Sequence, residues 1–237
     1  MNIQMMKTRL SPEFLTQLGA ANPCMEFKDA AGRPNGNVRL PVARLSFANL
    51  ARPGKNNLDP SKEGKYGANL LFLPNADLNA ARQARARVLA EKFPNNPQGM
   101  GMKDPFRDQA DRVAPAQGGR NPKGQSTSGY VPGSVFMAPT SNRPVQLFVP
   151  PIVNGIPTVF VGGEKEIERE FYSGCWVIAV INFYASTNAQ NPGVFAGLQQ
   201  MLKVADDNEF QGTSSVDPRT AFGGVNISQD IQPSSLF

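Results

Sequence analysis

Proline and glycine recur along almost the whole chain, with 21 Pro and 22 Gly in 237 residues. Because proline removes a backbone donor and both residues favour turns, most regular elements between them must be short. The 40% apolar content is still enough for one sizeable core. The sequence therefore predicts a single loop-rich domain built from short elements.

Alternating apolar residues predict a series of β-strands. The segment 38–50 predicts one long strand with a change of parity near Ala43. The segment 49–64, rich in Gly, Pro, Asn and Lys, predicts a hairpin loop, and Tyr66, Ala68, Leu70 and Phe72 then share one face of a second strand. Further strand patterns follow at 134–138, 145–149, 158–161, 175–184 and 196–204.

A helical composition is found between Asp77 and Phe93, where Ala, Leu, Arg and Glu prevail without Gly or Pro. Asp77 is a suitable N-cap for this helix. Strands interrupted by one helix lack the alternation of a parallel βαβ sheet. The pattern therefore favours a mainly β protein, either a barrel or a sandwich.

Three segments lack the periodicity of packed elements. Residues 1–37 are interpreted as an N-terminal extension, with regular structure expected from near Val38. Residues 94–129 are too long for an ordinary connection and predict an inserted arm. Residues 211–237 are too poor in apolar side chains to order themselves and predict a flexible C-terminal tail, which leaves 38–210 as the domain.

Charge is unevenly distributed along the chain. Residues 1–150 contain 20 Lys and Arg against 10 Asp and Glu, whereas residues 151–237 contain 4 against 9. A basic region suits a polyanionic partner, because each neutralised phosphate releases condensed counterions. The charge alone does not identify the polyanion.

Several classes of function are excluded by what the sequence lacks. It has no histidine, which removes Ser-His and Cys-His nucleophile pairs and His-bearing zinc sites. The glycine pairs lack the companion residues of a nucleotide-binding loop. Cys24 and Cys175 lie far apart and no apolar run is long enough to cross a bilayer, so we expect a reduced cytoplasmic protein with no membrane contact and no cofactor.

Basic side chains of the first region are candidates for phosphate contacts. Arg82, Arg85 and Arg87 lie on one flank of the predicted helix. A helix face exposed to water explains such residues equally well, so the helix alone does not decide the question. The wider candidate groove adds Lys65, Arg107, Arg112, Arg120, Lys123 and Arg143.

Aromatic residues near basic ones are a second signal, because every nucleobase has a π-face and stacking contributes ~1–3 kcal/mol per base. If alternate residues of the strand 175–184 face the core, then Trp176, Asn182 and Tyr184 face outward. Core filling is the alternative for both rings. Tyr66 and Tyr130 are further candidates of the same kind.

Acidic residues form two clusters that a magnesium-dependent nuclease would need, but their spacing matches no metal motif. The clusters are Asp104, Asp108 and Asp111 in the arm, and Asp206, Asp207 and Glu209 after the last strand. We interpret both as solvated carboxylates. Glutamate also occupies every second position from Glu164 to Glu170, which predicts one exposed strand face.

Several strings, in their order and content, resemble a family of phage single-stranded DNA-binding proteins. They are RLSFANL at 44–50, KY at 65–66, YSGCW at 172–176, NFYA at 182–185, GVFAGLQQMLKV at 193–204, and Asp206 followed by FQG at 210–212. Together they span roughly residues 38 to 212, so the resemblance covers the predicted domain and leaves both ends unsupported.

The resemblance implies an OB-fold, a five-stranded barrel with one α-helix, long inserted loops and a flexible tail. It implies a protein that coats and protects unpaired DNA in the host cytoplasm during replication or recombination, with little sequence preference, and self-association along the DNA. Its tail would meet phage or host replication proteins, although here the tail has Phe237 but only Asp217 and Asp230 as acids. The candidate DNA contacts are Arg39, Arg44, Lys65, Tyr66, Arg82, Arg85, Arg107, Arg143, Trp176, Asn182, Tyr184 and Lys203.

Two other functions stay open on the residues alone. A structural protein of the virion suits a Gly- and Pro-rich β-domain with arms. A magnesium-dependent nuclease would use one of the carboxylate clusters, although we expect no enzymatic activity.

Overall fold

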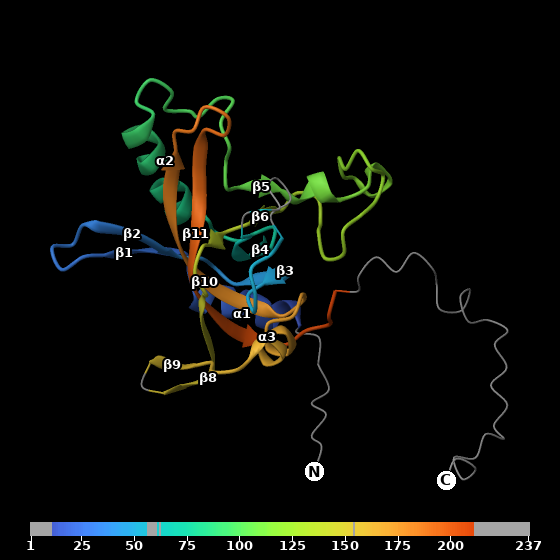
Figure 1. Ribbon diagram of the computed structural model, residues 1–237. Helices are drawn as coiled ribbons and strands as arrows, with labels where there is room; N and C mark the ends of the chain where they lie inside the picture. The colour runs from blue at the N-terminus through green and yellow to red at the C-terminus, as the bar shows by residue number, and fades with distance from the viewer. Residues whose placement is uncertain (1–10, 56–60, 62, 154, 211–237) are drawn as a thin grey trace, which may run out of the picture.

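The computed structural model describes residues 11–55, 61, 63–153 and 155–210, and these form a mainly β protein with an 11-stranded sheet (Figure 1). The longest strands are β10 (Trp176–Ser186) and β11 (Gly193–Ala205), which pair antiparallel and stand upright in Figure 1. The predicted strands at 175–184 and 196–204 are thereby confirmed. A mainly β fold agrees with the sequence, which alternates apolar and polar residues along these segments.

The predicted hairpin around residues 49–64 is confirmed. It joins β3 (Ala43–Asn49) to β4 (Tyr66–Phe72), and the two strands pair antiparallel. Ala68, Leu70 and Phe72 are buried in the main core, and Tyr66 packs against it. The period of two along β4 therefore places its apolar face inward, as predicted.

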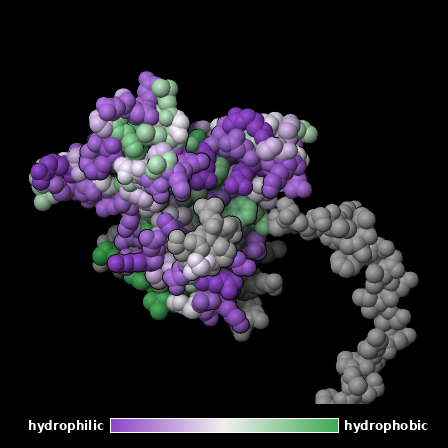
Figure 2. Space-filling view, turned by 45° about the horizontal axis from the view of Figure 1, so that its top comes forward, coloured by the Kyte–Doolittle hydropathy of each residue, from purple (hydrophilic) through white to green (hydrophobic). Residues whose placement is uncertain are grey.

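The next part of the sheet is divided into short strands. β6 (Val135–Met137) and β7 (Thr140–Ser141) pair antiparallel with β4, whereas β7 and β8 (Gln146–Val153) run parallel to β11. β8 forms a hairpin with β9 (Ile156–Val159). Ile152, Ile156 and Val159 are exposed on this hairpin, and Figure 2 shows apolar atoms at the lower left, where the hairpin lies.

The single strand expected over 38–50 is two strands, because β2 (Pro34–Arg39) ends before Pro41 and β3 begins after it. β2 pairs with β1 (Met25–Lys28) and with β10. The expectation that regular structure begins near Val38 is therefore wrong. The β1–β2 turn is held by the Asp29 carboxylate, which accepts hydrogen bonds from the amides of Ala31 and Arg33, both at 2.9 Å.

The predicted helix is confirmed as α2 (Asn79–Lys92), with Ala81, Ala84 and Leu89 buried in the main core. Asp77 accepts a hydrogen bond from the Asn79 amide at 2.9 Å, but Leu78 occupies the N-cap position. The expectation of one α-helix is wrong, because the described residues also form α1 (Pro12–Ala21) and α3 (Glu164–Glu170).

Helix α3 replaces the exposed strand that the alternating glutamates predicted. Its seven residues place Ile167 against the main core, while Glu164, Glu166 and Glu168 are exposed. A pattern of alternating charges that flanks one apolar residue fits a short amphipathic helix as well as a strand, and packing of Ile167 decides between them.

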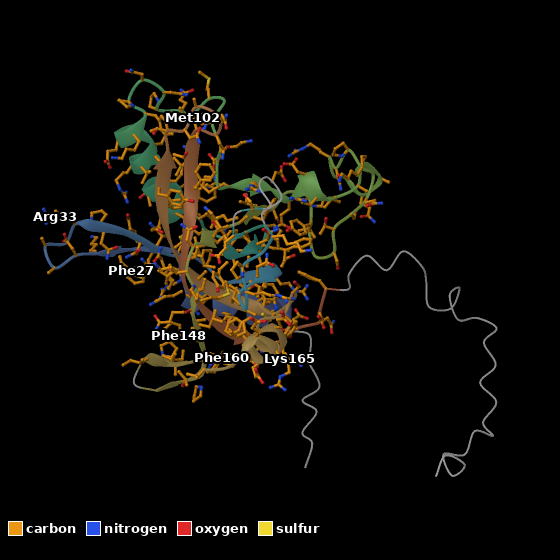
Figure 3. All side chains as sticks on the ribbon, in the orientation of Figure 1. Phe27, Arg33, Met102, Phe148, Phe160 and Lys165 are labelled. Carbon is orange, nitrogen blue, oxygen red and sulfur yellow. The ribbon has the colours of Figure 1, made fainter. Side chains whose placement is uncertain are left out.

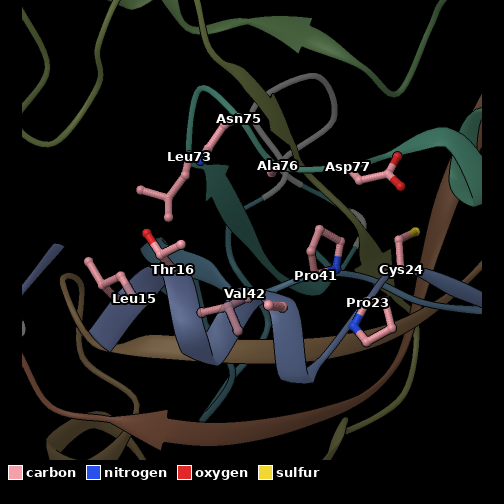
Figure 4. A pocket seen from close by; sticks show the side chains of 12 residues that line it. Leu15, Thr16, Pro23, Cys24, Pro41, Val42, Leu73, Asn75, Ala76 and Asp77 are labelled. Carbon is pink, nitrogen blue, oxygen red and sulfur yellow. The ribbon is translucent and has the colours of Figure 1, made fainter. Parts of the chain in front are cut away.

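Helix α1 covers one end of the strands. Ser11 caps it by accepting a hydrogen bond from the Phe14 amide at 3.2 Å, and Pro12 follows at its first turn. Leu15 and Leu18 pack in a small cluster with Trp176. A cavity of about 250 Å³ remains between α1 and the strands, and Figure 4 shows Leu15, Val42 and Leu73 around it.

The segment from 94 to 133 consists of two parts. Residues up to Phe106 return over the end of the β10–β11 hairpin, where Lys103 bridges to Gly193 and Met102 lies near the top of the molecule (Figure 3). β5 (Arg107–Asp108) then pairs with β6, and the 3₁₀ turns η1 (Gln109–Arg112) and η2 (Pro115–Gln117) follow in the arm. The predicted insertion is thus a folded arm.

No helix in the described part of the chain has the length and apolarity to span a membrane. Cys24 and Cys175 are both free thiols. The predicted tail 211–237 lies outside the described residues.

Candidate nucleic-acid interface

The outward faces of β3, β4 and β6 form one surface under the arm. In β4, Asn69 and Leu71 alternate with the core residues Leu70 and Phe72 and therefore point outward. Asn69 donates a hydrogen bond from Nδ2 to the Tyr130 hydroxyl at 2.7 Å. A second cluster follows, in which Phe210 packs against Leu71, Val113, Tyr130 and Phe136.

Two arginines stand beside the aromatic residues of this surface. The Arg107 guanidinium lies 5.7 Å from the centre of the Phe136 ring, which meets the Tyr130 ring edge to face at 5.3 Å. Burial raises the pKa of Tyr130, and the nearby charges of Arg112 and Arg107 lower it in part. Both arginines are exposed, whereas Tyr130 and Phe136 are 6% and 1% exposed, so this surface offers cationic groups over buried rings.

Arg44 of β3 holds the chain that leaves β11. Its guanidinium donates hydrogen bonds to the carbonyl oxygens of Gly174 at 3.0 Å and Asn208 at 2.9 Å. It lies 4.4 Å from the centre of the Phe210 ring and 3.5 Å from the Asp207 carboxylate. Arg44 also borders a groove of about 1000 Å³ that runs between α1, the end of β4 and the arm.

A second aromatic surface lies on the β10–β11 hairpin. Tyr184 is paired in register with Phe195, and their rings stack with centres 5.8 Å apart and an interplanar angle of 24°. Asn182 accepts a hydrogen bond from Gln199 Nε2 at 2.7 Å. The outward positions predicted for Tyr184 and Asn182 agree with this arrangement, since Ile181 and Phe183 are buried in the main core.

One row of paired residues joins the two surfaces. Asn182 of β10 pairs with Gly197, Gly197 with Thr140 of β7, Thr140 with Gly67 of β4, and Gly67 with Asn49 of β3. The two glycines add no side chains to this row. Adjacent strands lie ≈ 4.8 Å apart, so the row spans about 19 Å. Asn49 is exposed and Thr140 and Asn182 are partly exposed, whereas the two glycines are buried.

Trp176 does not face solvent, and the expectation that it would is wrong. It is 4% exposed, and its Nε1 donates a hydrogen bond to the Asp207 carboxylate at 2.9 Å. The predicted parity of β10 is correct, because Val177, Ala179 and Ile181 face the main core. Helix α1 covers the other face of β10 at Trp176. The sequence pattern did not predict α1 as packed structure.

Lys203 is likewise largely removed from the outer surface, which gives its predicted contact with DNA no support. Its side chain is 7% exposed, and its ammonium pairs with Glu170 at 2.7 Å and Asp206 at 2.9 Å. Burial disfavours the charged ammonium, but hydrogen bonds and charges from these two carboxylates outweigh burial and raise the pKa of Lys203. The lysine joins α3 to the end of β11.

The arginines of α2 lie apart from the β4–β6 surface, on the other side of the β10–β11 hairpin in Figure 1. Arg85 pairs with Asp104 at 2.6 Å and is 15% exposed, and Arg87 pairs with Glu26. Arg82 is exposed, with its guanidinium 4.7 Å from the Phe106 ring centre. Arg39 donates a hydrogen bond to the Pro23 carbonyl oxygen at 3.3 Å. These contacts stabilise packing around α2. Arg82 and Arg87 are exposed, whereas Arg39 and Arg85 are partly buried.

Lys65, Tyr66 and Arg143 gather at one end of the β4–β7 ladder. Tyr66 pairs in register with Ser141, so Lys65 and Arg143 flank the same end of these strands. Both basic side chains are exposed, whereas Tyr66 packs against the main core. This end contributes positive charge but no free aromatic face from Tyr66.

The carboxylates of the arm are bound by arginine. Arg120 pairs with Asp108 at 2.7 Å and with Asp111 at 3.0 Å. A hydrogen bond from the Ala110 amide is the main cause that lowers the pKa of Asp108. In the described ranges, no group of three or more His, Cys, Asp or Glu residues could hold a metal ion.

Three aromatic residues of these surfaces were missed by reasoning from the sequence. Phe136 occupies an outward position on the predicted strand 134–138, where strict alternation would have identified it. Phe195 lies one residue before the predicted strand 196–204, because β11 begins at Gly193. Phe210 follows the last strand and has no pattern of its own. Its contact with Arg44 depends on the tertiary fold.

A family model described as the single-stranded DNA-binding protein of Enterobacter phage Enc34 matches residues 36–232. The solved structure of the single-stranded DNA-binding protein from bacteriophage Enc34 is 20% identical and has a TM-score of 0.53, covering 84% of this chain and 98% of that chain. The same phage protein in complex with single-stranded DNA gives 20% identity and a TM-score of 0.54, over 79% of this chain and 98% of that one. No curated protein matches the chain.

Proposed function

Since the chain belongs to the family of single-stranded DNA-binding proteins described for Enterobacter phage Enc34, we propose that it binds unpaired DNA across the outer surface formed by β3, β4, β6 and the β10–β11 hairpin. One observation supports the choice of this surface. Exposed Arg107 and Arg112 lie on the β4–β6 side, the partly exposed Tyr184–Phe195 pair lies on the hairpin, and one row of paired residues joins the two sides.

We propose an OB-type barrel as the scaffold of this surface. β10 pairs with β3, β3 with β4, β4 with β7, β7 with β11, and β11 with β10, so the sequence of pairings returns to its start. OB-folds bind oligonucleotides on one barrel face and on the loops beside it. The face of β4 and β6, with the loop from 50 to 65 and the β10–β11 hairpin, corresponds to that arrangement.

The proposed contacts divide by chemistry. Phosphates are met by exposed cations around the surface, and bases stack on the exposed side of the Tyr184–Phe195 pair. The proposed phosphate contacts are Arg107, Arg112, Lys65 and Arg143. Stacking accepts every base, so sequence preference is slight.

Preference for unpaired DNA follows from the same chemistry. Only a separated strand offers base faces to a ring, so binding lowers the free energy of the open form and removes hairpins. We assign the chain to replication or recombination of phage DNA in the host cytoplasm, without catalysis. Asp104, Asp108 and Asp111 pair with arginines and Asp206 pairs with Lys203, which gives a nuclease no support. The tail remains our candidate for contacts with replication proteins. The candidate binding unit begins before residue 38, because α1, β1 and β2 belong to the fold.

A pair of charge variants tests the surface. Arg107→Gln and Arg112→Gln should each lower the slope of log K against log salt by ~0.7, because each removes one phosphate contact on a single strand. Lys165→Gln, on α3, serves as the matched control, since Lys165 is exposed and lies away from the surface. Fluorescence anisotropy with labelled oligo-dT measures all three. Equal slopes for the two arginine variants and the unmodified chain would place the DNA elsewhere.

A further inference from the structure

Strand β3 is irregular at Phe47. Its pairing with β4 moves from Ser46 opposite Asn69 to Asn49 opposite Gly67, which is three residues along β3 against two along β4. An extra residue of this kind is a β-bulge, and it redirects the side chains around it. Phe47 lies inside the bulge with φ of 47°, a left-handed conformation that large side chains rarely adopt.

The bulge turns the Phe47 ring outward. Leu45 faces the core, so regular alternation would direct Phe47 inward as well. Phe47 is instead 55% exposed, while Ala48 packs against the core in its place. Among the described residues, Phe47 is the most exposed aromatic side chain, followed by Phe14 at 46% and Tyr184 at 38%.

The neighbours of Phe47 belong to the proposed DNA surface. Ser46 is buried and hydrogen-bonds to Tyr130, whose hydroxyl also binds Asn69. On the other side, β3 continues into the loop that returns at Lys65, where the Gly54 amide donates to the Lys65 carbonyl oxygen at 2.9 Å. The ring therefore stands between the Tyr130 surface and the basic end of β4.

We infer that Phe47 is a stacking position for one unpaired nucleobase, presented by the bulge of β3. This rests on the proposed function and adds a base-binding position at the opposite end of the row from Tyr184. Packing does not account for a strained backbone that exposes a large apolar ring to water. A base stacked on the Phe47 ring would account for this exposure, because the base covers the face of the ring while the adjoining phosphates reach Lys65.

The test separates backbone strain from binding. Phe47→Asn removes the ring and introduces a residue that tolerates positive φ. Its thermal midpoint should equal or exceed that of the unmodified chain, while its affinity for oligo-dT falls about tenfold or more, the loss expected for one base–aromatic contact. Phe14→Asn, an exposed aromatic position on α1, is the matched control and should bind with unchanged affinity.

The tryptophan fluorescence of Phe47→Trp provides the second measurement. In Phe47→Trp the indole at position 47 should be quenched by oligo-dT, after subtraction of the response of the buried Trp176 measured in the unmodified chain. Unchanged affinity of Phe47→Asn, or an unquenched indole, in a protein that binds oligo-dT would overturn the stacking role alone. It would then favour a protein partner for the ring. Failure of the unmodified chain to bind would overturn the proposed function itself.

Discussion

Trp176 and Tyr184 are eight positions apart on β10 and face the same way along the strand, but only one of them is accessible. α1 packs over Trp176, whose indole is bound to Asp207, whereas Tyr184 is 38% exposed beyond the reach of α1. Strand parity could be predicted from the alternation of Val177, Ala179 and Ile181. Burial of Trp176 could not, because it depends on a helix distant in sequence.

Substituting these two aromatic residues should separate DNA binding from stability. Tyr184→Ala should weaken binding of oligo-dT by ~1–3 kcal/mol, the contribution of one stacked base. Trp176→Phe should leave the affinity within about threefold, because a ring at 4% exposure stacks on no base. It should lower the free energy of unfolding by ~1.5–3 kcal/mol through loss of the charged hydrogen bond to Asp207. Fluorescence anisotropy measures the affinity, and urea unfolding measures the stability. Weaker DNA binding by Trp176→Phe together with unchanged binding by Tyr184→Ala would contradict the structure.

The half-buried thiol of Cys24 and the buried thiol of Cys175 limit the stability of the molecule at alkaline pH. Burial raises the pKa of Cys24 to about 11 and of Cys175 to about 12, above the ~8.5 of an exposed thiol. Folding favours the protonated thiols, so their contribution is complete below about pH 8.5 and is lost as pH rises toward the folded values. Urea unfolding should therefore show falling stability from pH 8.5 to 11. The loss should be shallower in Cys24→Ala, and an identical slope would contradict burial of that thiol.

At the scale of elements, prediction of a strand or helix from the sequence succeeded where the local pattern agreed with the packing. The alternation of β4 and the composition of α2 both predicted what is present. α3 was mistaken for a strand because alternating glutamates leave only Ile167 to reveal the buried side. β2 and β3 were joined because the pattern continued across Pro41, where the backbone leaves one strand pairing for another.

Helix α1 offers a test of one such element. Leu18→Ala removes a half-buried side chain from the cluster around Trp176 and should cost about 1–2 kcal/mol, less than a fully buried leucine. The emission of Trp176, the single tryptophan, should also shift to longer wavelength as water reaches the indole. Gln17→Ala, exposed on the same helix, should change neither. An unshifted spectrum in Leu18→Ala would mean that α1 does not cover Trp176.

At the scale of the whole molecule, the basic first region and the β architecture were predictable, but the surface that combines them was not. Composition counts every arginine equally, whereas the fold pairs Arg85 with Asp104 and Lys203 with Glu170 and leaves Arg107 accessible. Pairing of charges across distant segments is a tertiary property. The sequence therefore predicts that phosphate is a suitable partner, but it does not predict which cations contact the phosphate.

Titration of labelled oligo-dT at two salt concentrations tests the central claim most directly. The account predicts tight binding in dilute buffer, a fall of log K with log salt of ~0.7 per phosphate contacted, and weaker binding of a duplex of equal length. Absence of binding at low salt, or an affinity that salt does not change, would contradict it.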